Sequence, residues 1–125
     1  DLSGRDLSRC VVEGASFRGA NLSSTDLTGR DLSKCTVKGA NFSGATLTNV
    51  QLPSDLSQVK FDNVDLTGRD LSKCTVKGAN FSGATLTNVQ LPSDLSQVKF
   101  DNVDLTGRNL SKCIVAGTSF SGATL

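Results

Sequence analysis

The sequence lacks most residue types from which catalytic, metal-binding and nucleic-acid-binding sites are built. It contains no His, Trp, Tyr or Met, and all six aromatic residues are Phe. Without His, general acid–base catalysis and zinc binding lose their commonest side chain. No amphipathic aromatic residue is available to stack on bases at the surface. Glycines recur at one fixed position, and none forms a phosphate-binding loop. We therefore expect no enzyme, no cofactor, no metal and no nucleic-acid partner.

Excess charge and long apolar runs are also missing. Thirteen basic and twelve acidic residues leave a net charge of +1, and apolar residues make up 37% of the chain. No apolar run approaches the roughly 20 residues of a membrane-spanning helix, and there is no signal peptide. We expect no membrane partner.

What the chain does contain is an internal repeat. Residues 26–64 and 65–103 are the same 39 letters, and a third, slightly changed copy begins at Asp104. Self-similarity at a fixed period is typical of stacked units that cover one another's hydrophobic faces. Surface positions drift after a natural duplication, so identity this complete indicates a very recent duplication or an engineered tandem repeat. Because the chain opens at Asp1 without Met, we also expect it to be a segment rather than a whole gene product.

A period of five residues runs inside the longer repeat. Its central positions are always Leu, Val or Phe, and all 12 glycines lie two positions after a centre. Most residues two positions before a centre are small. A period of five fits neither an α-helix nor a flat strand. Two steps are only four residues long, from Leu52 to Leu56 and from Leu91 to Leu95.

This pattern resembles the pentapeptide-repeat family, whose loose motif is A(D/N)LXX. The segments that carry the motif are ANLSS at 20–24, ANFSG at 40–44 and 79–83, and ATLTN at 45–49 and 84–88. The resemblance covers the whole chain and implies one all-β domain over residues 1–125, a right-handed, four-sided (quadrilateral) β-helix solenoid. In that fold each pentapeptide forms one side, and the central and minus-two residues point inward.

Grouping every fourth pentapeptide supports four sides per coil. One column then contains Phe42, Phe61, Phe81, Phe100 and Phe120, whereas groups of three or five scatter them. The 39-residue unit becomes one coil of twenty and one of nineteen residues, and the chain becomes a rod of about six coils.

Two departures from this column pattern carry expectations of their own. Phe17 lies one side away, so we expect the first 25 residues to be wound differently or to cap the rod. We expect the short steps to form tightened corners at Pro53 and Pro92, with Leu56 and Leu95 still inward.

The cysteines and three arginines occupy minus-two positions. For Cys10, Cys35, Cys74 and Cys113 we expect buried structural thiols, with a redox or metal role as the alternative. Cys35, Cys74 and Cys113 share one column and lie two coils apart in turn, too far for a disulfide. Unpaired thiols indicate a reducing compartment such as the cytoplasm. Three guanidiniums cannot stay unpaired in a narrow core. Arg30, Arg69 and Arg108 therefore either bend outward toward Asp31 or Asp70, or lie buried and hydrogen-bonded.

Two ladders of exposed side chains are candidate surfaces. The first contains lysines on adjoining sides: Lys34, Lys73 and Lys112, with Lys38 and Lys77. Such charges most often form a solvated surface, and the alternative is a protein-binding stripe. The second contains Thr28, Thr48, Thr67, Thr87 and Thr106, and it resembles the Thr arrays of ice-binding β-solenoids. Asp26, Asp65 and Asp104 interrupt the neighbouring column and should spoil a flat face.

We predict that the chain is a non-catalytic scaffold or protein-interaction module. An engineered extended repeat is one form that such a module could take. The alternative is a partner-binding segment of a larger protein, such as a bacterial effector ubiquitin ligase. Family members that mimic DNA and act on gyrase are strongly acidic, unlike this chain. We expect a convex rod without a deep pocket, and end-to-end self-association through its open terminal coils.

Overall fold

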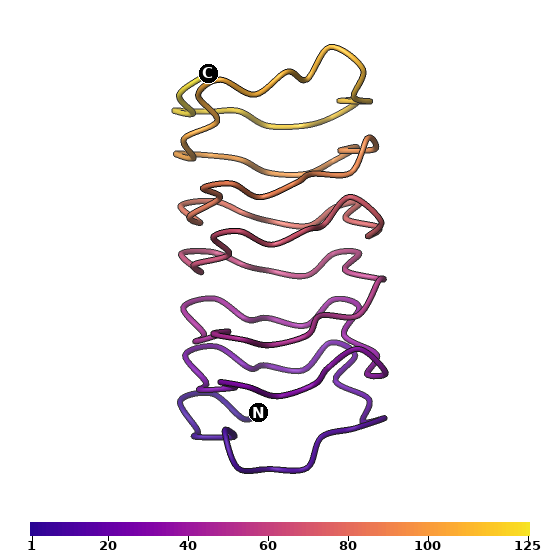
Figure 1. Ribbon diagram of the computed structural model, residues 1–125, viewed down its shortest axis with the longest axis vertical. Helices are drawn as coiled ribbons and strands as arrows, with labels where there is room; N and C mark the ends of the chain where they lie inside the picture. The colour runs from indigo at the N-terminus through magenta and orange to yellow at the C-terminus, as the bar shows by residue number, and fades with distance from the viewer.

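The chain winds into a stack of coils, and the computed structural model describes all 125 residues (Figure 1). No α-helix or extended strand is present, because each side contributes only one bridging residue before the next turn. All bridges are parallel and join residues one coil apart. Asn21 pairs with Asn41 twenty positions later, and Asn41 pairs with Lys60 nineteen positions later. The two coil lengths together account for the 39-residue repeat. The structure contains no helix that is long and apolar enough to cross a lipid bilayer.

The four sides of the rod are named here by their inward residues. Face 1 contains Leu22, Phe42, Phe61, Phe81, Phe100 and Phe120. Face 2 contains Leu7, Leu27, Leu47, Leu66, Leu86 and Leu105. Face 3 contains Leu32, Leu52, Leu71, Leu91 and Leu110. Face 4 contains Phe17, Val37, Leu56, Val76, Leu95 and Val115. Nearly all of these side chains belong to, or pack against, one hydrophobic core, as the five-residue period predicts.

The Phe residues of face 1 stack along the axis of the rod. Phe42, Phe61, Phe81 and Phe100 are fully buried. Successive ring centroids from Phe42 to Phe120 lie 5.8, 5.4, 5.7 and 5.7 Å apart, with interplanar angles of 10–15°. Ring pairs at such distances contribute about 0.5–1.5 kcal/mol each beyond burial.

On faces 1, 2 and 4, nearly all corners are tight turns with a left-handed residue two positions after the inward one. After Phe81, for example, the backbone N–H of Ala84 donates to the Phe81 carbonyl at 2.9 Å. Gly83, between them, has φ of +68°, which glycine adopts without strain. Gln58 and Gln97 adopt φ of +60° and +61° at the same corner position. The recurrent glycines are therefore explained by backbone conformation.

The shortened corners have the predicted form. Pro53 and Pro92 are buried, and Leu56 and Leu95 are fully buried on face 4. The N–H of Leu56 donates to the carbonyl of Thr75 at 2.8 Å. The loss of one residue is thus absorbed before the next inward leucine, and the predicted corner is confirmed.

The first 25 residues follow the same winding as the rest, so the prediction of a different winding or a cap is wrong. Leu7 N–H donates to Asp26 O, and Phe17 N–H donates to Thr36 O, each at 2.7 Å. Phe17 lies in the column of Val37 because its pentapeptide belongs to face 4, where a ring at the end of the rod remains only partly buried.

The bridge ladder is continuous on face 1 alone. It links Asn21, Asn41, Lys60, Asn80, Lys99 and Ser119 without interruption. From residue 15 onward, bridges on the other three faces form only within pairs of coils, which we call double coils: residues 15–53, 54–92 and 93–125. One further bridge on face 2, Asp6–Asp26, joins the preceding residues to the first double coil. The bridges of the second double coil are Asp55–Thr75, Lys60–Asn80, Asp65–Thr85 and Asp70–Gln90. Between double coils, only Asn41–Lys60 and Asn80–Lys99 remain.

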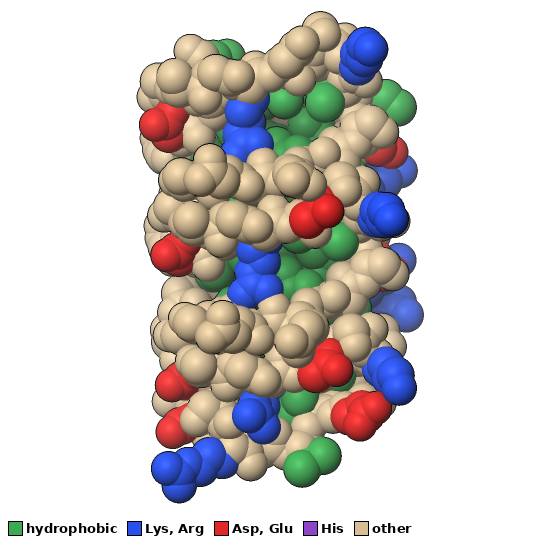
Figure 2. Space-filling model, in the orientation of Figure 1, with side chains coloured by type: hydrophobic (Ala, Val, Ile, Leu, Met, Phe, Trp, Pro, Cys, Tyr) green, Lys and Arg blue, Asp and Glu red, His purple; other side chains and the backbone are tan.

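A cleft separates the first two double coils along faces 2 and 3. It has a volume of about 890 Å³, and its lining includes Leu47, Leu52, Leu71 and Arg69. Figure 2 shows apolar side chains exposed between tan bands of backbone and uncharged polar side chains, with basic side chains crossing the gaps. The expectation of a rod without a pocket is therefore wrong, because adjacent double coils do not pair on these faces.

The arginines at the clefts are half-buried and hydrogen-bonded. Arg69 donates from its two terminal nitrogens to the carbonyls of Val50 and Leu47. Arg108 does the same with Val89 and Leu86. Burial lowers the pKa of Arg69, and Asp65 partly opposes this shift.

Arg30 donates to the carbonyl of Cys10 at 3.2 Å. None of the three arginines forms an ion pair with Asp31 or Asp70, because the one salt bridge lies elsewhere. Of the two alternatives raised by the sequence, the structure supports the hydrogen-bonded one.

Candidate protein-interaction surface

The lysines follow inward residues of two adjoining faces. Lys34, Lys73 and Lys112 lie two positions after the face-3 leucines, and Lys38 and Lys77 lie one position after the face-4 valines. They therefore surround the corner between faces 3 and 4, and we call these five residues the lysine stripe. Four are exposed and Lys38 is partly buried.

Acidic residues lie between the lysines of the stripe, on the intervening coils. Asp55 and Asp94 are exposed bridging residues of face 4. Hydrogen bonds from the hydroxyl and backbone N–H of Ser57 hold the pKa of Asp55 below its usual value, and the charge of Lys38 adds to this. Ser96, and then Lys77, lower the pKa of Asp94 in the same way. Both aspartates therefore stay ionised, and the stripe alternates in sign.

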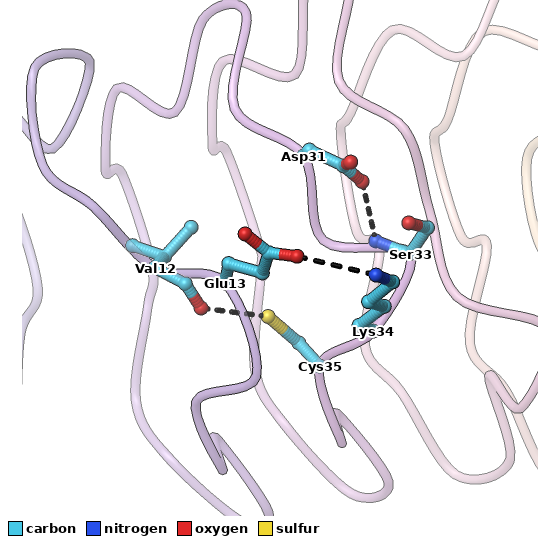
Figure 3. A network of polar contacts seen from close by, with 6 residues as sticks. All are labelled: Val12, Glu13, Asp31, Ser33, Lys34 and Cys35. Carbon is cyan, nitrogen blue, oxygen red and sulfur yellow. Dashed lines mark hydrogen bonds and ion pairs between the residues drawn. The ribbon is translucent and has the colours of Figure 1, made fainter.

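One lysine of the stripe forms an ion pair. Lys34 Nζ lies 3.3 Å from a carboxylate oxygen of Glu13, with both side chains mostly exposed (Figure 3). An exposed pair of this kind contributes about 0–1 kcal/mol. Lys73, Lys77 and Lys112 have no such partner. The lysines toward the middle and end of the rod are therefore the freest to meet another molecule.

A local capping contact recurs around the whole rod, and the sequence prediction missed it. The residue before each centre is often Asp or Asn, and it accepts hydrogen bonds from the Ser or Thr just after the centre. Asp65 Oδ1 accepts from the N–H and the hydroxyl of Thr67, at 2.9 and 2.6 Å. Asn80 Oδ1 accepts from Ser82 in the same way. The recurrent pattern D/N–x–S/T was the available signal.

These caps change the chemistry of the threonine ladder. The hydroxyls of Thr28, Thr67 and Thr106 donate to Asp26, Asp65 and Asp104 within their own pentapeptides. The clefts also interrupt face 2, where the ladder lies, because the bridges from Thr46 and Thr85 to the next coil are missing. The threonines therefore do not form one uniform, evenly spaced array.

The cysteines differ in exposure and form no disulfide. Cys35 is buried, and its Sγ donates to the Val12 carbonyl at 3.0 Å (Figure 3). Cys74 and Cys113 are half-buried, and burial raises the pKa of the Cys74 thiol. Cys10 is exposed, so its predicted burial is wrong, because in the first coil its pentapeptide forms no bridge with the coil above. No group of three or more Cys, Asp or Glu side chains is placed to hold a metal ion.

The family model for pentapeptide repeats matches the chain with eight copies, over residues 1–33, 31–53, 54–88 and 93–125. Among solved structures, a trypsin-treated variant of QnrB1, a plasmid-mediated fluoroquinolone resistance protein, is 28% identical with a TM-score of 0.44. HetL, from the cyanobacterium Nostoc and involved in heterocyst differentiation regulation, is 28% identical with a TM-score of 0.36. A pentapeptide repeat protein of the Arabidopsis thaliana thylakoid lumen is 29% identical with a TM-score of 0.30.

The matches cover 98% of this chain in all three cases. They cover 68%, 65% and 62% of the three solved chains, in the same order. No curated protein sequence matches significantly.

Proposed function

Because the chain belongs to the pentapeptide-repeat family, with its right-handed quadrilateral β-helix, we propose that it is a non-catalytic scaffold of about six coils that binds a protein partner. The supporting observation is the lysine stripe, in which Lys34, Lys73 and Lys112 recur at intervals of one 39-residue unit. A rod held in a single register presents such charges at fixed positions. Their spacing would determine which partner surfaces can be engaged simultaneously.

The partner that fits this surface is a protein with an acidic, regularly spaced face. Each exposed lysine adds little by itself, because surface ion pairs are weak and screened by salt. Several contacts on one rigid rod act together, and electrostatic complementarity mainly raises the association rate and the specificity. Asp55 and Asp94 would repel a uniformly acidic partner at the coils between the lysines. They therefore favour a partner whose acidic groups match the spacing of the stripe.

A charge-reversal experiment tests this proposal. Lys73→Glu combined with Lys77→Glu alters the stripe, and Lys60→Glu combined with Lys99→Glu makes the same net change on face 1. Binding of a fluorescent peptide, whose glutamates are separated by neutral residues, is measured by anisotropy at low and moderate salt. We expect the stripe variant to lose most of the binding and the face-1 variant to keep it. Equal losses in both variants would show that net charge, and not the stripe, determines binding.

Two versions of this role remain distinct proposals. The chain spans about two thirds of the length of the solved proteins described above, so it would also serve as the partner-binding segment of a larger protein. The identity of residues 26–64 and 65–103 equally suits an engineered extended repeat. The four free thiols favour a reducing compartment such as the cytoplasm in either case.

We also propose that the 125-residue chain self-associates end to end. The exposed large apolar residues of the C-terminal coil are Ile114, Val115 and Leu125, with exposed fractions of 56%, 44% and 73%. The last coil also leaves backbone groups unpaired, and open β edges pair readily with another chain. A second copy stacked on this coil would cover both.

A further inference from the structure

At the clefts, backbone groups lack the hydrogen-bond partners that the equivalent groups have within a double coil. Within a double coil, Leu27 N–H donates to Thr46 O at 3.0 Å, and Gly29 N–H donates to Thr48 O at 2.8 Å. The equivalent donors at the edge of the first cleft, Leu47 N–H and Asn49 N–H, have no backbone acceptor. The missing bonds are a property of the junction, because all of these residues belong to the same face.

An arginine side chain donates hydrogen bonds to two backbone carbonyls at this edge. Val50 holds the position that Arg30 holds one coil earlier, where the Arg30 carbonyl accepts the N–H of Gln51 at 3.2 Å. No backbone N–H reaches the Val50 carbonyl, and a terminal nitrogen of Arg69 donates to it instead. The second terminal nitrogen donates to the carbonyl of Leu47. The guanidinium thus replaces the missing ladder bond.

We propose that each cleft contains a guanidinium-binding site, formed by two backbone carbonyls of one double coil and occupied by an arginine of the next. The planar fork of a guanidinium matches two adjacent acceptors better than the point charge of a lysine does. The same arrangement occurs twice, since Arg108 donates to Val89 and Leu86 as Arg69 does to Val50 and Leu47. The acceptors are main-chain atoms, so the site depends on the fold and not on particular side chains.

On face 4, one backbone hydrogen bond crosses each junction, from Gly39 N–H to Ser57 O at 3.0 Å and from Gly78 N–H to Ser96 O at 3.1 Å. On faces 2 and 3, the arginine site is the main polar link between double coils. On faces 2 and 3, the Arg69 bonds are joined only by a weak thiol contact from Cys74 to the Pro53 carbonyl at 3.9 Å. On face 1, the Asn41–Lys60 bridge and the Phe42–Phe61 ring contact cross the junction. Backbone contacts on faces 1 and 4 therefore join neighbouring double coils, and one arginine per junction clamps them at the opposite corner, between faces 2 and 3.

Chemical rescue tests the proposed site. Arg69→Ala should empty it and lower the melting temperature, and free guanidinium should partly restore the clamp. The melting temperature of the variant is measured in guanidinium chloride below the denaturing range, and in equal concentrations of sodium chloride and of urea. We expect the melting temperature of Arg69→Ala to be higher in guanidinium chloride than in sodium chloride or urea, whereas guanidinium lowers that of the unsubstituted protein.

Two further variants complete the test. Arg108→Ala empties the last cleft and keeps the experiment informative if Arg69→Ala does not fold. Arg18→Ala removes an exposed arginine that donates no hydrogen bond, and it should show no rescue. A guanidinium response of Arg69→Ala and Arg108→Ala equal to that of Arg18→Ala would overturn the proposal. The lysine stripe contributes nothing to the site, so this result would leave the proposed function untouched.

Discussion

Replacing Phe81 by Ala should be among the most destabilising single changes in the chain. Phe81 is fully buried, and its ring lies 5.4 Å from that of Phe61 and 5.7 Å from that of Phe100. Truncating a buried Phe to Ala costs about 3–5 kcal/mol, because transfer energy is lost and a cavity remains. Two ring contacts are lost as well, so we expect the upper part of this range.

The measurement is the free energy of unfolding from urea titrations followed by circular dichroism. Phe120→Ala is the matched control, since Phe120 is only partly buried and has a single ring neighbour, Phe100. We expect its loss to be roughly half or less of that at Phe81. Phe42→Ala, in the same ANFSG context, should also exceed the control. A Phe81→Ala loss below about 1 kcal/mol, or equal losses at Phe81 and Phe120, would refute the inward stack along face 1.

Three other outcomes are expected. Hydrogen bonds from Thr67 lower the pKa of Asp65 below its ordinary 3.8, so Asp65 stabilises the fold above that value and loses this contribution as the pH falls below it. Asp65→Asn keeps an acceptor, as at Asn80, and acid titration should show a shallower loss of stability in the variant than in its parent. Gln58→Gly should stabilise the protein by about 1 kcal/mol in urea, because Gln58 has φ of +60°, whereas Gly68→Ala should destabilise it. No atom lies within 4 Å of a Cβ added at Gly68, so steric contact would not explain a loss of stability there. A Gly68→Ala variant as stable as its parent would contradict the argument from backbone conformation. Light scattering should show assembly of the 125-residue chain that Leu125→Lys reduces, and a monomer at high concentration would count against end-to-end stacking.

The five-residue period, and the resemblance to pentapeptide repeats that it carries, predicted the architecture. The resemblance implies four sides with one inward residue on each pentapeptide, and the column of Phe residues supports four sides per coil. The same reasoning located Leu56 and Leu95 inside the core despite the missing residue at each short step. These predictions succeeded because the same positions are inward in every pentapeptide. The inward assignment therefore rests on many repeats and not on a single segment.

The clefts could not be predicted in this way. Paired and unpaired junctions have the same inward Leu, Val and Phe pattern, so hydrophobic periodicity does not distinguish them. Arg69 and Arg108 at inward positions were the only sign, and their placement depends on backbone carbonyls that the sequence does not specify. Cys10 was misplaced for a related reason, since inward phase ensures burial only where the next coil pairs with it.

The surface was the least predictable part. The lysine stripe follows from the phase, but its alternation with Asp55 and Asp94 depends on which coils lie next to one another. The Asp and Asn caps were visible as a recurrent D/N–x–S/T pattern and were read only as solvent-exposed positions. The identity of a partner depends on the surface of a second molecule, which the sequence of this chain does not specify.

The chain winds in alternating coils of 20 and 19 residues, and its bridge ladder is continuous on face 1. Trans-hydrogen-bond NMR couplings between an amide nitrogen and the carbonyl carbon of its acceptor test this most directly. Couplings should join Phe61 to Asn80 and Phe81 to Lys99, and Leu66 to Thr85 within a double coil. None should link Leu47 to Asp65 across the cleft. Couplings at other sequence separations would contradict the winding, and a Leu47–Asp65 coupling would contradict the double coils.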